Sequence, residues 1–366
     1  MHEIMGSQFI ELTWSIALQV TFLGFIGGML SGFIGSGGAF FMTPGMMNLG
    51  VMGNVAVASN ITHKFGKALI GSKKHAELGN VDKKLSIFMA ITGAVGIQLA
   101  AWLVELMSGG GDSHEGGAGV DLYISVVFVV VLSLVSLSML KDIMNTRKGN
   151  GTGPSTKIVD FLGKFNIPPM IHFQVADVKV SLWVVLICGL ATGYLAGTIG
   201  VGGFIGVPAM IYVFGVSASV AAGSELFLAQ FNGAFGALTY AFKGMVDIRL
   251  VLLLFAGSLF GIYIGAYGTK VVKEIFIRMV TALIILLCVL SRLVNIPAYM
   301  QQLGYLDIDA SSNHYFELAS KILLYASGIT GGALILVFVL KAYFQRRKIQ
   351  TSLTTGVVPR ESGSPV

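Results

Sequence analysis

The chain has 366 residues, of which 54% are hydrophobic and only 11% charged, and its net charge is +6. Soluble domains carry about 25% charged residues, so this composition excludes a soluble fold and predicts an all-α polytopic protein that lies in the lipid bilayer. The surplus of Lys and Arg is typical of cytoplasmic loops in such a protein, and nucleic acid is not expected as a partner.

Nine apolar stretches are candidates for membrane helices, because about 20 apolar residues of helix span the hydrocarbon. They cover residues 14–34, 51–71, 85–107, 121–140, 180–200, 216–242, 250–269, 274–294 and 318–340. No basic region or cleavage motif precedes the first stretch, so we expect a membrane segment there rather than a signal peptide. Two shorter apolar runs, 39–49 and 204–214, follow glycine clusters and predict re-entrant or half-helical pieces.

The connections divide the chain into five parts. Residues 1–140 form a first transmembrane repeat and residues 180–294 a second, joined by a basic hydrophilic connection at 141–179. Residues 295–341 add an acidic loop and an extra membrane helix, and the tail 342–366 is expected to be disordered. With the short runs read as discontinuous helices, about 7–9 segments cross the membrane.

The repeat emerges when the chain is compared with itself at a shift of 165 residues. Of the 62 positions from 24 to 85, 19 are identical without a gap. The identities depend on Gly, Ser and Asp, including Ser59 with Ser224 and Asp82 with Asp247. Shared apolar composition does not explain such a match, so we expect two homologous repeats.

Matched glycines recur every fourth residue in one helix of each repeat. They are Gly24, Gly28 and Gly32 in the first repeat, and Gly189, Gly193 and Gly197 in the second. This spacing places them on one helix face, where small residues let two helices approach closely in lipid.

Two further glycine clusters, Gly35-Ser36-Gly37-Gly38 and Gly200-Val201-Gly202-Gly203, are each followed by a proline. Closely spaced Gly disfavours a continuous helix, so each cluster predicts a break at membrane depth. Paired breaks in two halves of a chain are typical of a transporter's substrate site, and the free backbone N–H groups favour an anion. A glycine turn without a ligand is the alternative.

Polar side chains inside the apolar segments are further candidates, because ionisable groups are expensive to bury in lipid. We expect Lys64 and His63 to contact the anion, with a snorkelling Lys and a packing His as alternatives. Glu225 is expected to take part in proton coupling unless a Lys or Arg from elsewhere pairs with it. Asp82 and Asp247 directly precede apolar runs and are expected to be helix N-caps.

The complete set of candidate substrate-binding residues combines both glycine breaks with the polar residues that follow them. The set is Gly35, Gly37, Gly38, Pro44, Ser59, Asn60, His63, Lys64, Gly200, Gly202, Gly203, Pro208, Ser224, Glu225, Gln230 and Asn232.

With these motifs the chain resembles the sulfite exporter family of the TauE/SafE type, also described as toluene-sulfonate uptake permeases. The pattern G-x-x-x-G-x-x-G-x-G-G followed by Pro, then A-x-x-S, then G-x-V-D, occurs in order in both halves. The first set runs from Gly28 to Pro44, through Ala56 to Ser59, to Gly79–Asp82, and the second from Gly193 to Pro208, through Ala221 to Ser224, to Gly244–Asp247. The resemblance covers roughly residues 20–110 and 180–290.

The resemblance implies a permease for sulfite, a sulfonate or a related organic anion, coupled to a gradient of protons or sodium, in the inner membrane of a bacterial cell. The 141–179 connection, the ninth apolar segment and the tail depart from the shorter members of the family.

Charge distribution distinguishes two topologies. Nine crossings with the N-terminus inside leave the repeats parallel and place 16 Lys and Arg inside and 8 outside. Seven crossings with the N-terminus outside, with 36–72 and 201–243 as re-entrant hairpins, invert the repeats and place 20 inside and 4 outside. The positive-inside rule favours the second arrangement, although 216–242 is long enough to span outright.

Together these features predict a secondary transporter that moves a small anion by alternating access around the paired breaks. The patterns G-x-x-x-x-G-K-[ST], H-E-x-x-H and G-x-S-x-G do not occur, so ATP hydrolysis, an enzyme activity, a metal and a cofactor are not expected. An anion channel and a non-transporting membrane assembly subunit are the alternatives.

Overall fold

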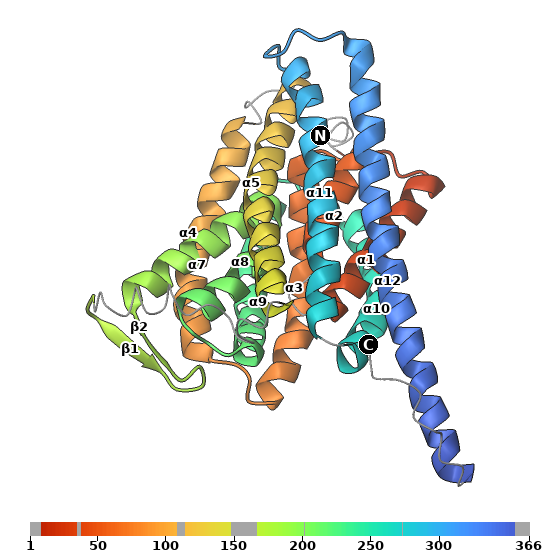
Figure 1. The fold of residues 1–366 in the computed structure, drawn as a ribbon. Helices are drawn as coiled ribbons and strands as arrows, with labels where there is room; N and C mark the ends of the chain where they lie inside the picture. The colour runs from red at the N-terminus through yellow and green to blue at the C-terminus, as the bar shows by residue number, and fades with distance from the viewer. Residues whose placement is uncertain are drawn as a thin grey trace.

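The computed structural model describes residues 9–34, 38–107, 114–147, 167–200, 202–272 and 274–355. It is a bundle of helices with one small β-hairpin (Figure 1). The helices are α1 (Trp14–Ile34), α2 (Ala39–Asn48), α3 (Gly53–Glu77), α4 (Lys83–Met107), α5 (His114–Arg147), α7 (Leu182–Ile199), α8 (Gly203–Pro208) with a π-helical turn η1 (Ala209–Val213), α9 (Ala218–Phe242), α10 (Ile248–Val271), α11 (Glu274–Gln302), the 3-10 turn η2 (Ala310–Ser312) and α12 (Asn313–Thr355).

Seven of these helices, α1, α4, α5, α7, α10, α11 and α12, are long and apolar enough to cross a membrane. Large apolar side chains such as Leu134 and Phe260 are more than 60% exposed on them, as expected where lipid rather than water surrounds the helix. The prediction of an all-α integral membrane protein with several membrane helices is therefore confirmed. Helices α3 and α9 have 25 residues each, which is long enough to cross a membrane. They are not among the seven apolar helices, and they carry the polar residues singled out above.

The connections differ from the sequence-based expectation. Helix α5 continues to Arg147 and α11 to Gln302, so both expected loops are shorter. An unpredicted hairpin pairs β1 (Met170–Phe173) with β2 (Val178–Ser181), antiparallel, in the expected basic connection. Helix α12 extends to Thr355, so residues 342–355, expected to be disordered, are helical; the last eleven residues lie outside the described part.

The glycine stripes pack one half of the chain against the other. A Cβ atom on Gly24, Gly28 or Gly32 of α1 would lie within 2.5 Å of the backbone of α10. The equivalent glycines of α7 face α4, where a Cβ atom on Gly193 would lie 2.0 Å from the carbonyl oxygen of Gly93. Only residues without a side chain allow such contact, so the expected packing role is confirmed.

Each of these contacts occurs twice, at positions 165 residues apart. Gly24 meets Leu254 while Gly189 meets Met89, and Gly71 of α3 meets Leu226 of α9 while Gly236 meets Ile61. The same spacing separates the first residues of α3 and α9, Gly53 and Ala218. The two halves thus exchange partners: the first helix of each packs against the fourth helix of the other, α1 against α10 and α7 against α4.

Within each half the first three helices run in alternating directions. Helix α2 turns back along α1, because Gly38 lies against Gly27 and Gly45 against Leu23. Helix α8 turns back along α7 in the same way, with Gly206 next to Thr192. Helices α3 and α9 follow and cross the middle of the bundle antiparallel to each other, as the contacts between their glycines require.

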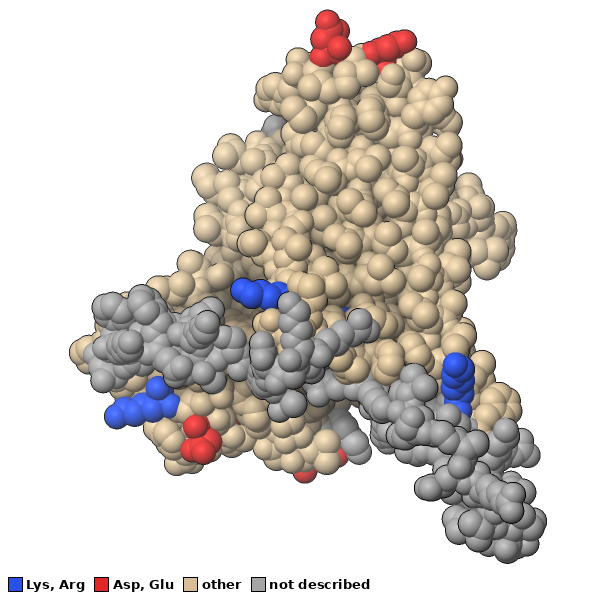
Figure 2. Space-filling view, in the orientation of Figure 1, with Lys and Arg blue, Asp and Glu red and all other residues tan. Residues whose placement is uncertain are grey.

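Charged side chains lie mainly at the two ends of the bundle (Figure 2). At the upper end of the face shown, only Asp and Glu are coloured, and the visible Lys and Arg lie in its lower half. The upper end carries the connection from α11 to α12, and the lower end carries the β-hairpin (Figure 1). This separation agrees with the arrangement that the positive-inside rule favours.

Candidate functional site

Both predicted helix interruptions are present in the structure. Helix α1 ends at Ile34 and α2 begins at Ala39, while α7 ends at Ile199 and α8 begins at Gly203. Gly35 and Gly37 lie outside the described residues, but Gly38, Gly200, Gly202 and Gly203 lie within them. Gly200 has a φ of +75° and closes α7 as a left-handed cap, a conformation that glycine adopts without strain.

The two interruptions meet near mid-depth. Gly32, near the end of α1, contacts Ile262, which lies about 21 Å along α10 at 1.5 Å per residue. Gly197, near the end of α7, contacts Ile97, about 21 Å along α4 from the opposite end. The turns therefore approach each other from opposite ends of the bundle and overlap near its centre.

Asn60 of α3 and Thr43 of α2 connect the two turns. The Asn60 Nδ2 donates to the Ala39 carbonyl at 2.9 Å and to Thr43 Oγ1 at 2.8 Å. The Thr43 hydroxyl donates to the Ile199 carbonyl at the end of α7 at 3.1 Å. A Cβ atom on Gly200 would lie 3.0 Å from Asn60 Nδ2, so Asn60 touches both interruptions.

Several polar atoms around this junction are buried and have no hydrogen-bond partner among the described residues. They are Asn60 Oδ1, His63 Nδ1 and Asn232 Oδ1. Buried polar atoms in proteins are almost always hydrogen-bonded to protein or to ordered water. The Asn60 and His63 atoms belong to α3, one turn apart on the same helix, and Asn232 belongs to α9.

A buried ion pair joins the two central helices beside the junction. Lys64 Nζ of α3 lies 3.1 Å from Glu225 Oε1 of α9, and the side chains are 12% and 2% exposed. Glu225 also lies against α8, since a Cβ atom on Gly206 would be 3.2 Å from Glu225 Cγ. Glu225 therefore pairs with a lysine from another helix, which was the alternative to its expected role in proton coupling.

His63 and Lys67 lie beside Lys64 on α3, within one turn of it. His63 is fully buried, its Nε2 is 2.8 Å from Ser258 Oγ of α10, and its ring packs on Phe255. Lys67, one turn after Lys64, interacts electrostatically with Lys64, and no ion pair within 4 Å involves it in the described part of the chain.

Thr43 and Lys67 are absent from the sequence-based set. Thr43 directly precedes Pro44, and Lys67 takes the position of the candidate Asn232 in the repeat. The position of Thr43 before the proline and the position of Lys67 in the repeat could have identified these two residues.

Ser59 and Ser224 lie farther from the junction, where each binds the opposite half. Ser224 Oγ accepts the backbone N–H of Asp82 at 2.9 Å, and Ser59 Oγ accepts that of Asp247 at 3.3 Å. These hydrogen bonds join α9 to the residue before α4, and α3 to the residue before α10.

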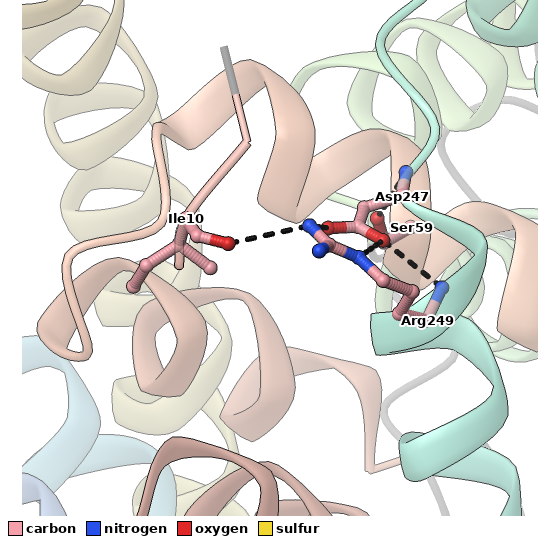
Figure 3. A network of polar contacts seen from close by, with 4 residues as sticks. All are labelled: Ile10, Ser59, Asp247 and Arg249. Carbon is pink, nitrogen blue, oxygen red and sulfur yellow. Dashed lines mark hydrogen bonds and ion pairs between the residues drawn. The ribbon is translucent and has the colours of Figure 1, made fainter. Parts of the chain in front are cut away.

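The two aspartates are helix N-caps, as expected. Asp82 accepts the N–H of Leu85, and Asp247 that of Arg249. Figure 3 shows the Asp247 end, where the Arg249 guanidinium binds the Asp247 carboxylate and reaches the Ile10 carbonyl before α1. At the other end, the Asp82 carboxylate accepts the N–H groups of Val175 and Ala176 in the hairpin turn.

The remaining candidates have packing positions. Pro44 is buried inside α2, and Pro208 ends α8 where the π-helical turn begins. The Gln230 Oε1 accepts the Ser72 hydroxyl at 2.7 Å, and Asn232 lies against Gly93. Gln230 and Asn232 thus connect α9 to α3 and α4.

Comparisons with known proteins agree with this architecture. The model of the family described as "Sulfite exporter TauE/SafE" matches residues 20–292. Three proteins of Bacillus subtilis (strain 168) are each 24% identical: "Probable membrane transporter protein YjnA" over 69% of this chain and 90% of its own, "Probable membrane transporter protein YunE" over 72% and 93%, and "Probable membrane transporter protein YdhB" over 69% and 91%. No solved structure gives a significant match.

Proposed function

Because the chain belongs to the sulfite exporter TauE/SafE family of membrane transporters, we propose that it is a secondary transporter of sulfite, a sulfonate or a related small organic anion. The anion binds where the α1–α2 and α7–α8 turns meet, beside Lys64 and Asn60. The observation that carries this proposal is the junction itself: two helix turns from opposite ends of the bundle, linked by Asn60 and Thr43, next to a buried Lys64–Glu225 pair.

The chemistry of the junction suits a negative charge. Neither the N-cap of α2, Gly38, nor that of α8, Gly202, has a side-chain cap, so N–H groups of the first turns remain for a ligand. Lys64 and Lys67 supply positive charge against the single carboxylate of Glu225. The unpartnered atoms of Asn60 and His63 lie on the α3 face that lines the same region.

Alternating access follows from the way the halves are joined. The first helix of each half packs on the fourth helix of the other, and the turns meet near the centre. A movement of α1 with α10 relative to α4 with α7 would open the junction first to one side of the membrane and then to the other.

We further propose that protons couple to transport at Glu225. When an anion binds Lys64, the buried carboxylate loses its counter-charge, and an unpaired buried charge costs several kcal/mol. Protonation of Glu225 restores neutrality, so each anion would travel with one proton. A dependence on sodium in place of protons would contradict this coupling.

The test is anion flux into proteoliposomes. Lys64→Gln should reduce the uptake of radiolabelled sulfite roughly tenfold or more, since it removes a charge-assisted contact. Lys73→Gln changes an exposed Lys on the same helix and should leave uptake unchanged. Equal flux in both variants would exclude Lys64 from the site, and current far above carrier turnover would favour a channel.

A further inference from the structure

A buried arginine lies in α11, near the end of the second repeat and away from the helix turns. Arg292 of α11 is only 1% exposed and is the largest fully buried residue in the described part of the chain. One of its terminal nitrogens donates to Ser320 Oγ of α12 at 3.0 Å, and the other lies 3.5 Å from Tyr299 Oη. The guanidinium Nε has no hydrogen-bond partner among the described residues.

The surroundings of Arg292 are polar but neutral. Asn48, the last residue of α2, contacts Ser291 and Ser320 through its amide, and Asn295 Oδ1 is buried without a partner in the described part of the chain. These groups form a second polar cluster, made by α2, α11 and α12.

Among the residues that the structure describes, no carboxylate lies within 4 Å of the Arg292 guanidinium. Asp121 of α5 interacts with it electrostatically from farther away, and its Oδ1 is already bound to the Gly53 N–H at 2.7 Å. An arginine in a membrane helix without a contacting counter-ion is expensive and is a functional candidate for that reason.

We propose that Arg292 binds a small oxyanion in a second site, separate from the junction of the helix turns. The planar guanidinium matches an oxyanion through paired N–H groups, and Nε is free to provide one of them. The Tyr299 hydroxyl lies 3.5 Å from the guanidinium and is close enough to donate to the same ligand, whereas the Ser320 hydroxyl donates to Asn48 Oδ1 at 3.1 Å. Arg292 is ten residues before the end of α11, about 15 Å along the helix, so this site lies toward the α11–α12 connection.

The site is independent of the proposed function, because none of its residues contacts Lys64 or Glu225 in the described structure. An anion held at Arg292 would also lie at the end of α2, whose Asn48 contacts the same serines. Occupation of this site would therefore act on the helix whose first turn forms the junction.

The experiment is titration of the purified full chain with sodium selenate, followed by calorimetry. Arg292→Gln should weaken the selenate binding that this site provides by roughly tenfold or more, because a charge-assisted contact is lost. Lys73→Gln, which changes an exposed Lys of α3, should leave that binding unchanged. Absence of selenate binding to the unmodified chain, or equal binding by Arg292→Gln, would overturn the proposal.

Asp121→Asn provides a second variant that retains the arginine. It removes the carboxylate that competes with the ligand for Arg292, so selenate should bind several-fold more tightly. Unchanged or weaker binding would show that Asp121 does not compete with the anion for Arg292 and would contradict this site. Gel filtration of each variant separates loss of binding from loss of fold, and Arg292→Lys should retain part of the affinity.

Discussion

Asn60 contacts both helix turns at the centre of the molecule. Its amide nitrogen binds α2 at two points and lies against Gly200 at the end of α7. The equivalent position in the second half is Glu225, which binds Lys64 instead. One half therefore contributes a neutral amide to the centre and the other a carboxylate, so two similar helices differ in the chemistry they provide.

Glu225→Gln should separate transport from the proton gradient. The variant keeps the shape of the side chain but cannot take up a proton, so methanesulfonate uptake into proteoliposomes should no longer rise when a pH gradient is imposed. Methanesulfonate is suitable because its charge is constant near neutral pH. Glu105→Gln, in which an exposed carboxylate beside Lys243 is changed, is the matched control and should stay coupled.

Persistence of gradient-driven uptake in Glu225→Gln would assign Glu225 a purely structural role as the partner of Lys64.

At the scale of the helices, the glycine stripes determine which elements pack together. The contacts of α1 with α10, and of α7 with α4, bring backbones so close that a single methyl group would overlap the neighbouring chain. Helices in lipid associate through close packing rather than through the hydrophobic effect. These two interfaces therefore contribute much of the specificity of the bundle.

Gly28→Ala should destabilise the α1–α10 interface. The added Cβ would lie 2.5 Å from the Ser258 carbonyl oxygen and 2.6 Å from its Cα, and backbone atoms cannot move aside as side chains do. Overpacking of this kind costs about 1–3 kcal/mol, so thermal unfolding in detergent should occur at a lower temperature.

Gly117→Ala is the control for that measurement, because the closest atom to its new Cβ would be 3.9 Å away. Alanine is the better helix former, so this variant should be as stable as the unmodified chain or slightly more so. An equal response of the two variants would mean that the stripe does not determine packing.

The sequence predicted the elements that depend on local patterns and missed those that depend on tertiary contacts. Apolar length predicted the membrane helices, and glycine spacing predicted both the close contacts and the turns after Ile34 and Ile199. The partner of Glu225 required knowledge of how α3 crosses α9, which no local pattern contains. Arg292 was missed because one arginine in an apolar stretch does not interrupt its hydropathy, and its neighbours come from α2 and α12.

For the whole molecule, the alternating directions of the helices affect the count of crossings. The three helices α1, α2 and α3 run in alternating directions, so together they take the chain across the membrane once. The same holds for α7, α8 and α9, whichever of the three helices spans the lipid. Together with α4, α5, α10, α11 and α12, this produces seven net crossings, the number preferred from the positive-inside rule. We therefore propose inverted repeats with the α11–α12 connection outside the cell.

Cysteine labelling tests this topology. In a chain whose Cys188 and Cys288 are replaced by serine, Tyr305→Cys in the α11–α12 connection should react with a membrane-impermeant maleimide in intact cells. Gln174→Cys in the hairpin turn should react only after the membrane is permeabilised. The reverse pattern would invert the orientation, and labelling of both from one side would exclude an odd number of crossings between them.

The two serine–aspartate contacts have a consequence for the energetics of the transport cycle. Ser59 with Asp247 and Ser224 with Asp82 form the same kind of contact, one before α10 and the other before α4. Both hydrogen bonds are present in this structure. In the proposed alternating-access cycle, one contact would break while the other holds, and the two resulting forms would correspond by exchange of the halves. Because Asn60 in one half corresponds to Glu225 in the other, the two forms would differ in free energy, and this difference would decide the side to which the protein opens when no anion is bound.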